Sequence, residues 1–204
     1  TTPKAYCSAY LGRTTLLAEQ DRAFETDIMT VNPYLGFDGV EPFLEDCRTY
    51  DKDIFILVKT SNLSSGDFQD LMTGNRRIYE AVADKVAEWG RDLIGRFGFS
   101  RAGAVVGATW PDQAAALRQR MPHTFFLVPG YGAQGGSADD IAGCFDERGL
   151  GAVINASRSI LCAYRKGSAE QPAGENFAEA ARDEVLRMKK EIGNALFQNG
   201  RKPW

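Results

Sequence analysis

The chain has 204 residues, of which 44% are hydrophobic and 25% are charged, and its formal net charge is −3. This length and composition are typical of one globular domain with a sizeable core. Nothing in this charge suggests a nucleic acid or an anionic membrane surface as a partner, and no apolar run approaches the ~20 residues of a membrane span. We therefore expect neither nucleic acid nor a membrane as a partner.

The cysteines and the N-terminal residues indicate whether the chain is a metal-binding, a secreted or an intracellular protein. Cys7, Cys47, Cys144 and Cys162 form no CxxC pair and His123 is the only histidine, so the sequence predicts no metal site. We expect four reduced, mostly buried thiols, as in an intracellular protein. The first residues contain neither a signal-peptide apolar region nor a Met, and their pattern is that of the middle of a helix.

Five short apolar runs, rich in β-branched residues, alternate with helical segments along the chain. Because these runs are almost continuously apolar, they predict strands that are buried on both faces, as in a parallel sheet. In chain order, the predicted strands are Asp27–Asn32, Ile54–Lys59, Gly103–Thr109, Thr124–Pro129 and Gly151–Ser157.

Helical patterns lie between these strands, after a first helix at the N-terminus. They are predicted from apolar residues at helical spacing, from a Pro-Asp pair or a Ser-Ala-Asp-Asp cap at the start, and from a glycine just after the end. The predicted helices are Leu71–Leu93, Pro111–Arg120, Ser137–Arg148 and Asn176–Gln198, and the polar segment Lys166–Glu175 predicts a surface loop.

This order of elements is that of an α/β protein, either a doubly wound open sheet or a (β/α)8 barrel. No GxGxxG follows a first strand and no Walker A motif is present, so nucleotide-binding open sheets lose support. Polar and glycine-rich segments follow several strands, where a barrel carries its functional loops. The sequence therefore predicts a (β/α)8 TIM-type barrel as a single domain over residues 1–204. The barrel is incomplete, because the last five strands are present and the first three are missing.

Two segments predict an anion site that suits a phosphate. Four glycines in Val128–Gly136 follow a strand and precede a helix cap at Ser137, so backbone N–H groups and the helix N-terminus would face a ligand. The alternative is a tight turn without a ligand. Arg158 follows the next strand and suits a bidentate phosphate contact, the alternative being a surface ion pair. In a barrel, the loops after strands seven and eight commonly form a phosphate site, so both segments would meet there.

Hydroxyl and amide side chains fill Lys59–Ser65, directly after a buried strand. Such groups suit hydrogen bonds to a polar ring. We assign Thr60 and Ser61 to ligand binding, and we assign Ser64 and Ser65 to helix capping.

Other polar residues carry weaker signals. The Asn-Pro pair in Thr30–Gly36 predicts a turn, with a structural or a functional role equally open. His123 has no local partner and is interpreted as structural. Asp139, Asp140 and Glu147 are interpreted as the solvated, capped face of a helix.

The motifs TVNPYLGFDGVEPF, LVKTSNLSS, GAVVGAT, PGYGAQGG and NASRSI occur in one order. Together they resemble the subgroup of orotidine 5'-phosphate decarboxylases found mainly in bacteria and in some protist fusion enzymes, over about residues 1–164. The resemblance implies a dimeric (β/α)8 barrel with active sites at the dimer interface. It implies the conversion of orotidine 5'-monophosphate to UMP and carbon dioxide, in pyrimidine biosynthesis, without a cofactor or metal. A cytoplasmic location is expected, or an organelle if the chain is an assembly subunit.

The resemblance also implies roles for individual residues. Gln134 and Arg158 would contact the phosphate, with backbone groups from Gly135 and Gly136. Ser61 would hydrogen-bond the pyrimidine.

The chain departs from the family's pattern at the catalytic cluster. Thr2 matches the final Thr of the family's DxKxxDIxxT motif, which reaches the ribose side of the site in the neighbouring subunit. The Asp, the Lys and the second Asp would precede Thr1, as would the family's other active-site Lys, and no DxKxxD occurs in the chain. Preorganised charge is usually the largest catalytic contribution. We therefore assign no catalytic residue, and we expect the chain alone to bind orotidine 5'-monophosphate or UMP without decarboxylating it.

Three explanations fit this departure. The chain is a fragment of a longer or cleaved polypeptide whose other piece supplies strands one to three, or its N-terminal part is unresolved, or it is a degenerate, non-catalytic subunit of a larger assembly. Five strands of an eight-stranded barrel leave two open sheet edges, which are an aggregation hazard. We therefore expect an N-terminal piece or covering subunits as partners.

Overall fold

The computed structural model describes residues 2–16, 19–21, 24, 26–132, 134–166 and 176–202. Its centre is a parallel sheet with the strand order β3 (Ile28–Val31), β4 (Asp53–Lys59), β7 (Ser100–Val106), β8 (Thr124–Pro129) and β9 (Ala152–Asn155). Each strand pairs with the next one along the chain, which is the order of a barrel and not of a doubly wound sheet. The predicted α/β class and the five predicted strands are confirmed, and the chain forms only part of a barrel.

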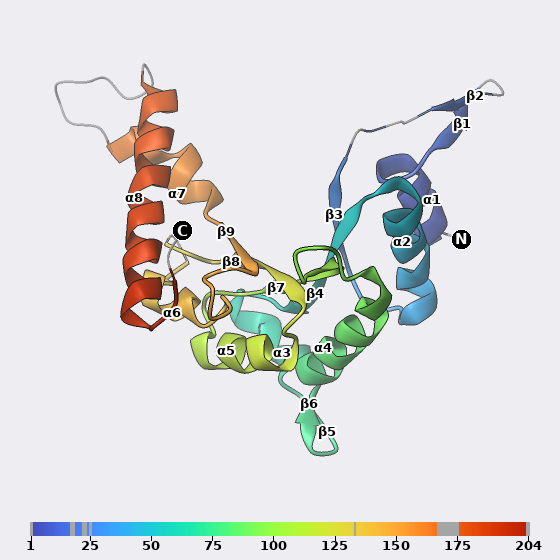
Figure 1. The fold of residues 1–204 in the computed structure, drawn as a ribbon, viewed down its shortest axis with the longest axis horizontal. Helices are drawn as coiled ribbons and strands as arrows, with labels where there is room; N and C mark the ends of the chain where they lie inside the picture. Colours follow the sequence, from blue (N-terminus) through green and yellow to red (C-terminus); the bar gives the residue numbers. More distant parts are fainter. Residues whose placement is uncertain are drawn as a thin grey trace.

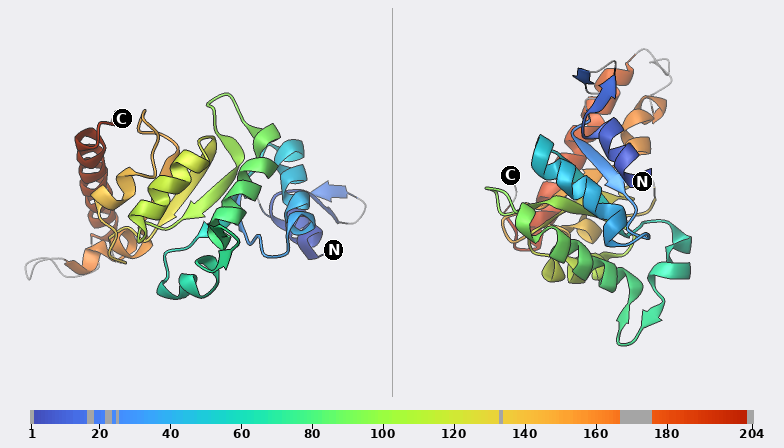
Figure 2. Two further views of the ribbon diagram at one scale, coloured as in Figure 1. Left: turned by 90° about the horizontal axis from the view of Figure 1, so that it is seen from below. Right: turned by 90° about the vertical axis from the view of Figure 1, so that its right-hand side faces the viewer.

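Helices follow every strand of the sheet and lie along its convex side (Figure 1). Seen from below, α4 and α5 lie across this face (Figure 2). The short antiparallel hairpins β1–β2 and β5–β6 lie outside the main sheet, and β5–β6 projects away from the body (Figure 1). The remaining elements are α1 (Thr2–Tyr10), β1 (Thr14–Leu16), β2 (Glu19–Asp21), α2 (Phe37–Tyr50), η1 (Leu63–Ser65), α3 (Gly66–Gln69), β5 (Met72–Thr73), β6 (Arg76–Arg77), α4 (Ile78–Trp89), η2 (Arg91–Leu93), α5 (Pro111–Arg120), α6 (Ala138–Ala142), α7 (Ser157–Leu161), η3 (Ala163–Lys166) and α8 (Phe177–Gln198).

The two faces of the sheet differ in burial. Ile54, Ile56 and Val58 of β4 are buried, whereas the intervening Phe55 and Leu57 are only partly buried. Strand β8 alternates in the same way, and β7 in the middle of the sheet is buried almost throughout. The expectation of burial on both faces is therefore correct for β7 and wrong for the other strands. The reason is that the inner face, which a closed barrel encloses, is open in this chain.

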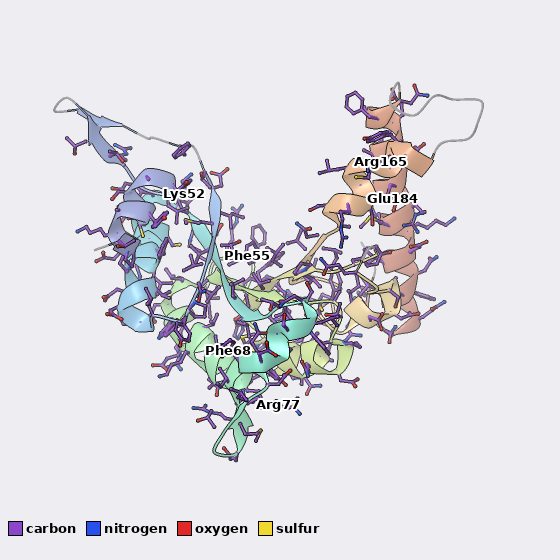
Figure 3. All side chains as sticks on the ribbon, turned by 180° about the vertical axis from the view of Figure 1, so that it is seen from behind. Lys52, Phe55, Phe68, Arg77, Arg165 and Glu184 are labelled. Atoms are coloured by element: carbon purple, nitrogen blue, oxygen red, sulfur yellow. The ribbon has the colours of Figure 1, made fainter. Side chains whose placement is uncertain are left out.

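The open face contains an apolar hollow of about 1270 Å³ near the amino ends of the strands. Phe55, labelled in Figure 3, lies on this face together with Phe99, Phe125 and Val153. Strands β3 and β9 form the two edges of the sheet, and the outer side of each pairs with no strand in the described part of the chain. The prediction of two open edges is confirmed for that part.

The predicted bounds of β8 and α5 match the structure. The helix predicted over Leu71–Leu93 begins only at Ile78, because the hairpin β5–β6 occupies the preceding residues. The helix predicted over Ser137–Arg148 ends at Ala142. The loop predicted over Lys166–Glu175 lies, apart from its first residue, outside the described residues.

The cysteines are free, and Cys7, Cys47 and Cys144 are buried while Cys162 is partly exposed, which confirms the prediction of mostly buried thiols. Burial raises the pKa of Cys47 and of Cys144 to about 12 in each case. None of the described helices combines the length and the apolar character needed to cross a membrane.

Candidate functional site

The predicted site residues of three loops meet at the carboxyl edge of the sheet. Thr60 and Ser61 follow β4, Gln134 lies in the loop after β8, and Arg158 lies in α7, directly after β9. Because the strands are parallel, these loops share the edge at which barrels bind their ligands.

The backbone of Ser61 packs directly against the residue that follows the neighbouring strand β7. A Cβ atom on Gly107, which follows β7, would stand 2.7 Å from both Cα and N of Ser61, so only a glycine lets the two chains approach this closely. Thr109 Oγ1 donates a hydrogen bond to the Ser61 carbonyl oxygen over 3.0 Å. The Ser61 hydroxyl makes no hydrogen bond within the described part of the chain, so it is available to a ligand.

Thr60, in contrast, uses its polar groups inside the loop. Its backbone N donates to Gln69 Oε1 (3.0 Å), and its hydroxyl accepts from Gln69 Nε2 (2.9 Å) and donates to Asn62 Oδ1 (2.7 Å). Trp110 Nε1 donates to the Thr60 carbonyl oxygen over 3.0 Å. These bonds fix the loop in which Ser61 lies, and a ligand contact by Thr60 stays a prediction.

A fully buried lysine supports the same loop, and our sequence analysis missed it. Lys59 Nζ lies 2.9 Å from Asp70 Oδ2 and 3.2 Å from Ser65 Oγ, and it lies over the Trp110 ring at 4.8 Å from the centroid. A charged residue at the end of an apolar strand was the signal that could have identified it. Ser65 makes no capping hydrogen bond, so its assignment to helix capping is wrong, because Lys59 uses its hydroxyl instead. Ser64 likewise makes no capping hydrogen bond in the short helix η1.

The glycine-rich loop (residues 130–136, of which 133 is not described) closes on itself. Gly130 and Gly135 both have a φ of 99°, a left-handed value that side chains disfavour. Gly136 N donates to the Gly130 carbonyl oxygen (3.1 Å), and Gly135 N donates to that of Gly132 (2.9 Å). These two amides therefore stabilise the loop in this structure, and their predicted contact with a phosphate stays a prediction.

Gln134 lies close to Ser61, although the two belong to different loops. A Cβ atom on Gly130 would stand 3.3 Å from Gln134 Oε1 and 3.5 Å from Ser61 Oγ. Ser61 Oγ and Gln134 Oε1 therefore both lie close to Gly130, at the carboxyl end of β8. The two loops therefore lie side by side, while the ligand contacts of both side chains stay predictions.

The helix after the glycine-rich loop begins with a capping box. Helix α6 has five residues, and its first amides are already capped, because Ser137 Oγ accepts from Asp140 N (3.2 Å) and Asp140 Oδ2 accepts from Ser137 N (2.8 Å). The predicted Ser137 cap is confirmed. The carboxylate of Asp140 at this position offsets part of the attraction that the helix N-terminus has for an anion, and a contribution of this N-terminus to phosphate binding stays a prediction.

Arg158 is the cation of the candidate site. Its side chain is exposed and makes no hydrogen bond or ion pair that involves another described residue, so the alternative of a surface ion pair has no support in that part of the chain. A Cβ atom on Gly132 would stand 2.9 Å from Ser159 Oγ, so the glycine-rich loop touches the residue next to Arg158. The two predicted phosphate-binding segments are therefore adjacent.

Thr2 is not part of this cluster within the chain. It is exposed at the start of α1, which packs on α2 beyond β3, at the opposite end of the sheet from β9 and α7 (Figure 1). A contribution of Thr2 to a ligand site in a second copy of the chain, which the resemblance implies, stays a prediction.

The other polar residues have structural partners. Asn32 Oδ1 accepts from Tyr34 N over 2.9 Å, and Gly36 N donates to the Pro33 carbonyl oxygen, which forms the predicted turn. His123 Nδ1 lies 3.0 Å from the Gly98 carbonyl oxygen. Within the described residues, no group of three or more His, Cys, Asp or Glu side chains is arranged to hold a metal.

Comparison with known proteins identifies the family. The model "Orotidine 5'-phosphate decarboxylase / HUMPS family" matches residues 14–171. The chain belongs to this family. It is 51% identical over 162 residues to the orotidine 5'-phosphate decarboxylase of Caldicellulosiruptor bescii, an alignment that covers 79% of this chain and 53% of that protein.

Further relatives agree with this identification. The orotidine 5'-phosphate decarboxylase of Rhodopirellula baltica is 45% identical over 193 residues, which cover 94% of this chain and 63% of the relative. The solved structure of Leishmania donovani OMP decarboxylase superposes with a TM-score of 0.65 at 31% identity, covering 96% of this chain and 64% of that chain. The chain thus spans about half to two thirds of the length of these orotidine 5'-phosphate decarboxylases.

Proposed function

We propose that this chain is part of an orotidine 5'-phosphate decarboxylase and binds the nucleotide orotidine 5'-monophosphate or UMP. Ser61 contacts the pyrimidine, and Gln134 and Arg158 contact the phosphate. The observation that carries the proposal is that Ser61 Oγ and Gln134 Oε1 both lie close to Gly130, while the same glycine-rich loop touches Ser159, the residue next to Arg158. Arg158 supports it further, because a phosphate would supply the anion that the described residues do not.

The catalytic Lys and Asp residues are proposed to come from outside the 204 residues. The open inner face and the two sheet edges support this, because three further strands would pair with β3 and β9 and would cover the apolar hollow. The reaction is proposed to need no cofactor or metal. A second copy of the chain is proposed to complete the site through Thr2, in a homodimer.

Calorimetry with UMP and uridine tests the ligand assignment. Arg158→Ala is expected to weaken UMP binding by about 1.5–3 kcal/mol, the range for a hydrogen bond to a charged group, and to leave uridine binding unchanged. Arg96→Ala is a matched control, because Arg96 is also exposed but precedes β7, at the amino edge of the sheet. Equal affinity of the unaltered chain for UMP and uridine would contradict the proposed phosphate site.

A mixing experiment tests the catalytic part. The chain alone, with its intact mass verified, is expected not to decarboxylate orotidine 5'-monophosphate, as followed by the loss of its absorbance. Adding a polypeptide that carries the first three strands and the DxKxxD cluster should restore activity. Inactivity of the mixture, with tight association to unrelated large subunits on gel filtration, would instead support a structural, non-catalytic subunit. Activity of the isolated chain would overturn the proposed location of the catalytic residues.

A further inference from the structure

The glycine-rich loop is anchored through its single aromatic residue. Tyr131 lies between Gly130 and Gly132, which both have positive φ values, of 99° and 72°. Its side chain belongs to the hydrophobic core and is 5% exposed. Its hydroxyl crosses to the C-terminal helix, where it donates a hydrogen bond of 2.9 Å to Glu191 Oε2 of α8.

The acceptor of this hydrogen bond is itself held in place. Arg187, one turn earlier in α8, donates to the other carboxylate oxygen of Glu191 and also pairs with Glu184 over 2.8 Å. Burial, together with the hydrogen bond to Glu191, raises the pKa of Tyr131 to about 12. The Tyr131 hydroxyl therefore stays protonated, and remains a donor, at neutral pH.

Helix α8 also supports the other half of the candidate phosphate site. It packs on α6, which follows the glycine-rich loop, and on α7, which carries Arg158. Figure 1 shows α8 running along these two short helices. One helix of 22 residues thus contacts the glycine-rich loop through Tyr131, the helix α6 after it and the helix α7 that carries Arg158, although it lies outside residues 14–171, which match the family model.

A loop of this composition needs such an anchor. Glycines lose more conformational freedom on ordering than any other residue, so an unanchored loop would lose part of the binding free energy on being ordered by the ligand. A loop that is already fixed by Tyr131 avoids that cost.

We propose that α8 positions the glycine-rich loop through the Tyr131–Glu191 hydrogen bond, and that this helix thereby sets the strength of phosphate binding without touching the ligand. Tyr131, Glu191 and Arg187 are positioning residues in this proposal. Its ligand-binding part rests on the proposed function, whereas the anchoring of the loop does not.

Amide hydrogen exchange measured by NMR tests the anchoring without any ligand. Tyr131→Phe keeps the ring in the core and removes only the hydroxyl. We expect it to speed exchange at the amides of Gly132, Gly135 and Gly136 by about tenfold, while amides in the middle of α8 keep their rates. Unchanged loop exchange, or an equal rise throughout α8, would overturn the proposal.

Variants of the acceptor separate positioning from a general loss of stability. Glu191→Ala should reproduce the effect of Tyr131→Phe on the loop amides, and Glu191→Gln should largely rescue it, because a side-chain amide oxygen still accepts the hydrogen bond. Glu179→Ala removes an exposed carboxylate near the start of the same helix and should leave the loop unchanged. A Glu179→Ala effect equal to that of Glu191→Ala would contradict a specific anchor.

Calorimetry then tests the consequence for binding. Tyr131→Phe and Glu191→Ala should weaken UMP binding by about tenfold and leave uridine binding unchanged, so that the preference for the phosphate falls. An equal loss of affinity for UMP and for uridine would overturn the proposal that the loop anchor sets the strength of phosphate binding. If the unaltered chain shows no preference for UMP, the proposed function and this link fail together, and the exchange data still decide whether α8 anchors the loop.

Discussion

Removing Asp70 should destabilise the fold more than removing its partner Lys59. The Lys59 side chain is 0% exposed and that of Asp70 is 29% exposed. Asp70→Ala would leave a buried ammonium group that retains the hydrogen bond to the Ser65 hydroxyl and the cation–π contacts with the Trp110 and Tyr79 rings, but no counter-charge. Leaving one charge of a buried pair uncompensated costs about 3–5 kcal/mol, and the partial exposure of Asp70 places the expected cost near the lower limit, at about 3 kcal/mol.

The opposite change should cost less. Lys59→Met keeps an aliphatic chain of similar length and leaves the carboxylate of Asp70 within reach of water, so a loss of about 1 kcal/mol is expected. In the double variant, Lys59→Met should recover part of the stability lost in Asp70→Ala, since no charge is then left buried.

Urea unfolding, followed by tryptophan fluorescence and circular dichroism, measures these free energies of unfolding. Asp67→Ala is the control, because it removes an exposed carboxylate from α3, the short helix that ends directly before Asp70, and its effect should stay below about 0.5 kcal/mol. The reasoning would be refuted if Asp70→Ala cost no more than Asp67→Ala, or if Lys59→Met were the more destabilising change.

Three further predictions concern other parts of the chain. Gly107→Ala should destabilise the fold by about 1–3 kcal/mol and weaken UMP and uridine binding alike, because its Cβ would stand 2.7 Å from the Ser61 backbone; unchanged binding of both would contradict this. A small maleimide should label Cys162 in the native chain, whereas the three buried cysteines should react only after unfolding, as peptide mass mapping would show. The hydrogen bond from Arg120 lowers the pKa of Asp84, so this carboxylate contributes stability at neutral pH that is lost as the pH falls below its usual value of 3.8. Asp84→Asn should therefore flatten the acid side of the stability profile, and an unchanged profile would count against the pair.

The parts of the fold that sequence reasoning identified are those with local causes. The bounds of α5 follow from its Pro-Asp start, and those of β8 follow from an apolar run that ends at a proline and a glycine. The predicted helix after Ser137 failed for reasons that are not local. A Cβ on Gly143 would stand 2.9 Å from Ala115 Cβ, so the chain passes close to α5, and Asp146 Oδ1 then accepts from the amides of Arg148 and Leu150 in a turn.

The same distinction applies to the candidate site. Strand order alone predicts that Ser61, Gln134 and Arg158 meet at one edge, because parallel strands bring their following loops together. The partners of Lys59 and Tyr131 could not be predicted, since they lie 11 and 60 positions further along the chain. Only the packed structure shows which distant side chains satisfy a buried charge or a buried hydroxyl.

The projecting hairpin β5–β6 is a suitable site for inserting a tag or a reporter. Its residues are all exposed, and a Cβ on Gly74 at its tip would meet no atom within 4 Å. Exposed tips of this kind tolerate added sequence, because no packed neighbour has to move. An affinity tag or a fluorescent reporter inserted between Gly74 and Asn75 would protrude from the helical side of the sheet, and both open edges would stay free for assembly experiments.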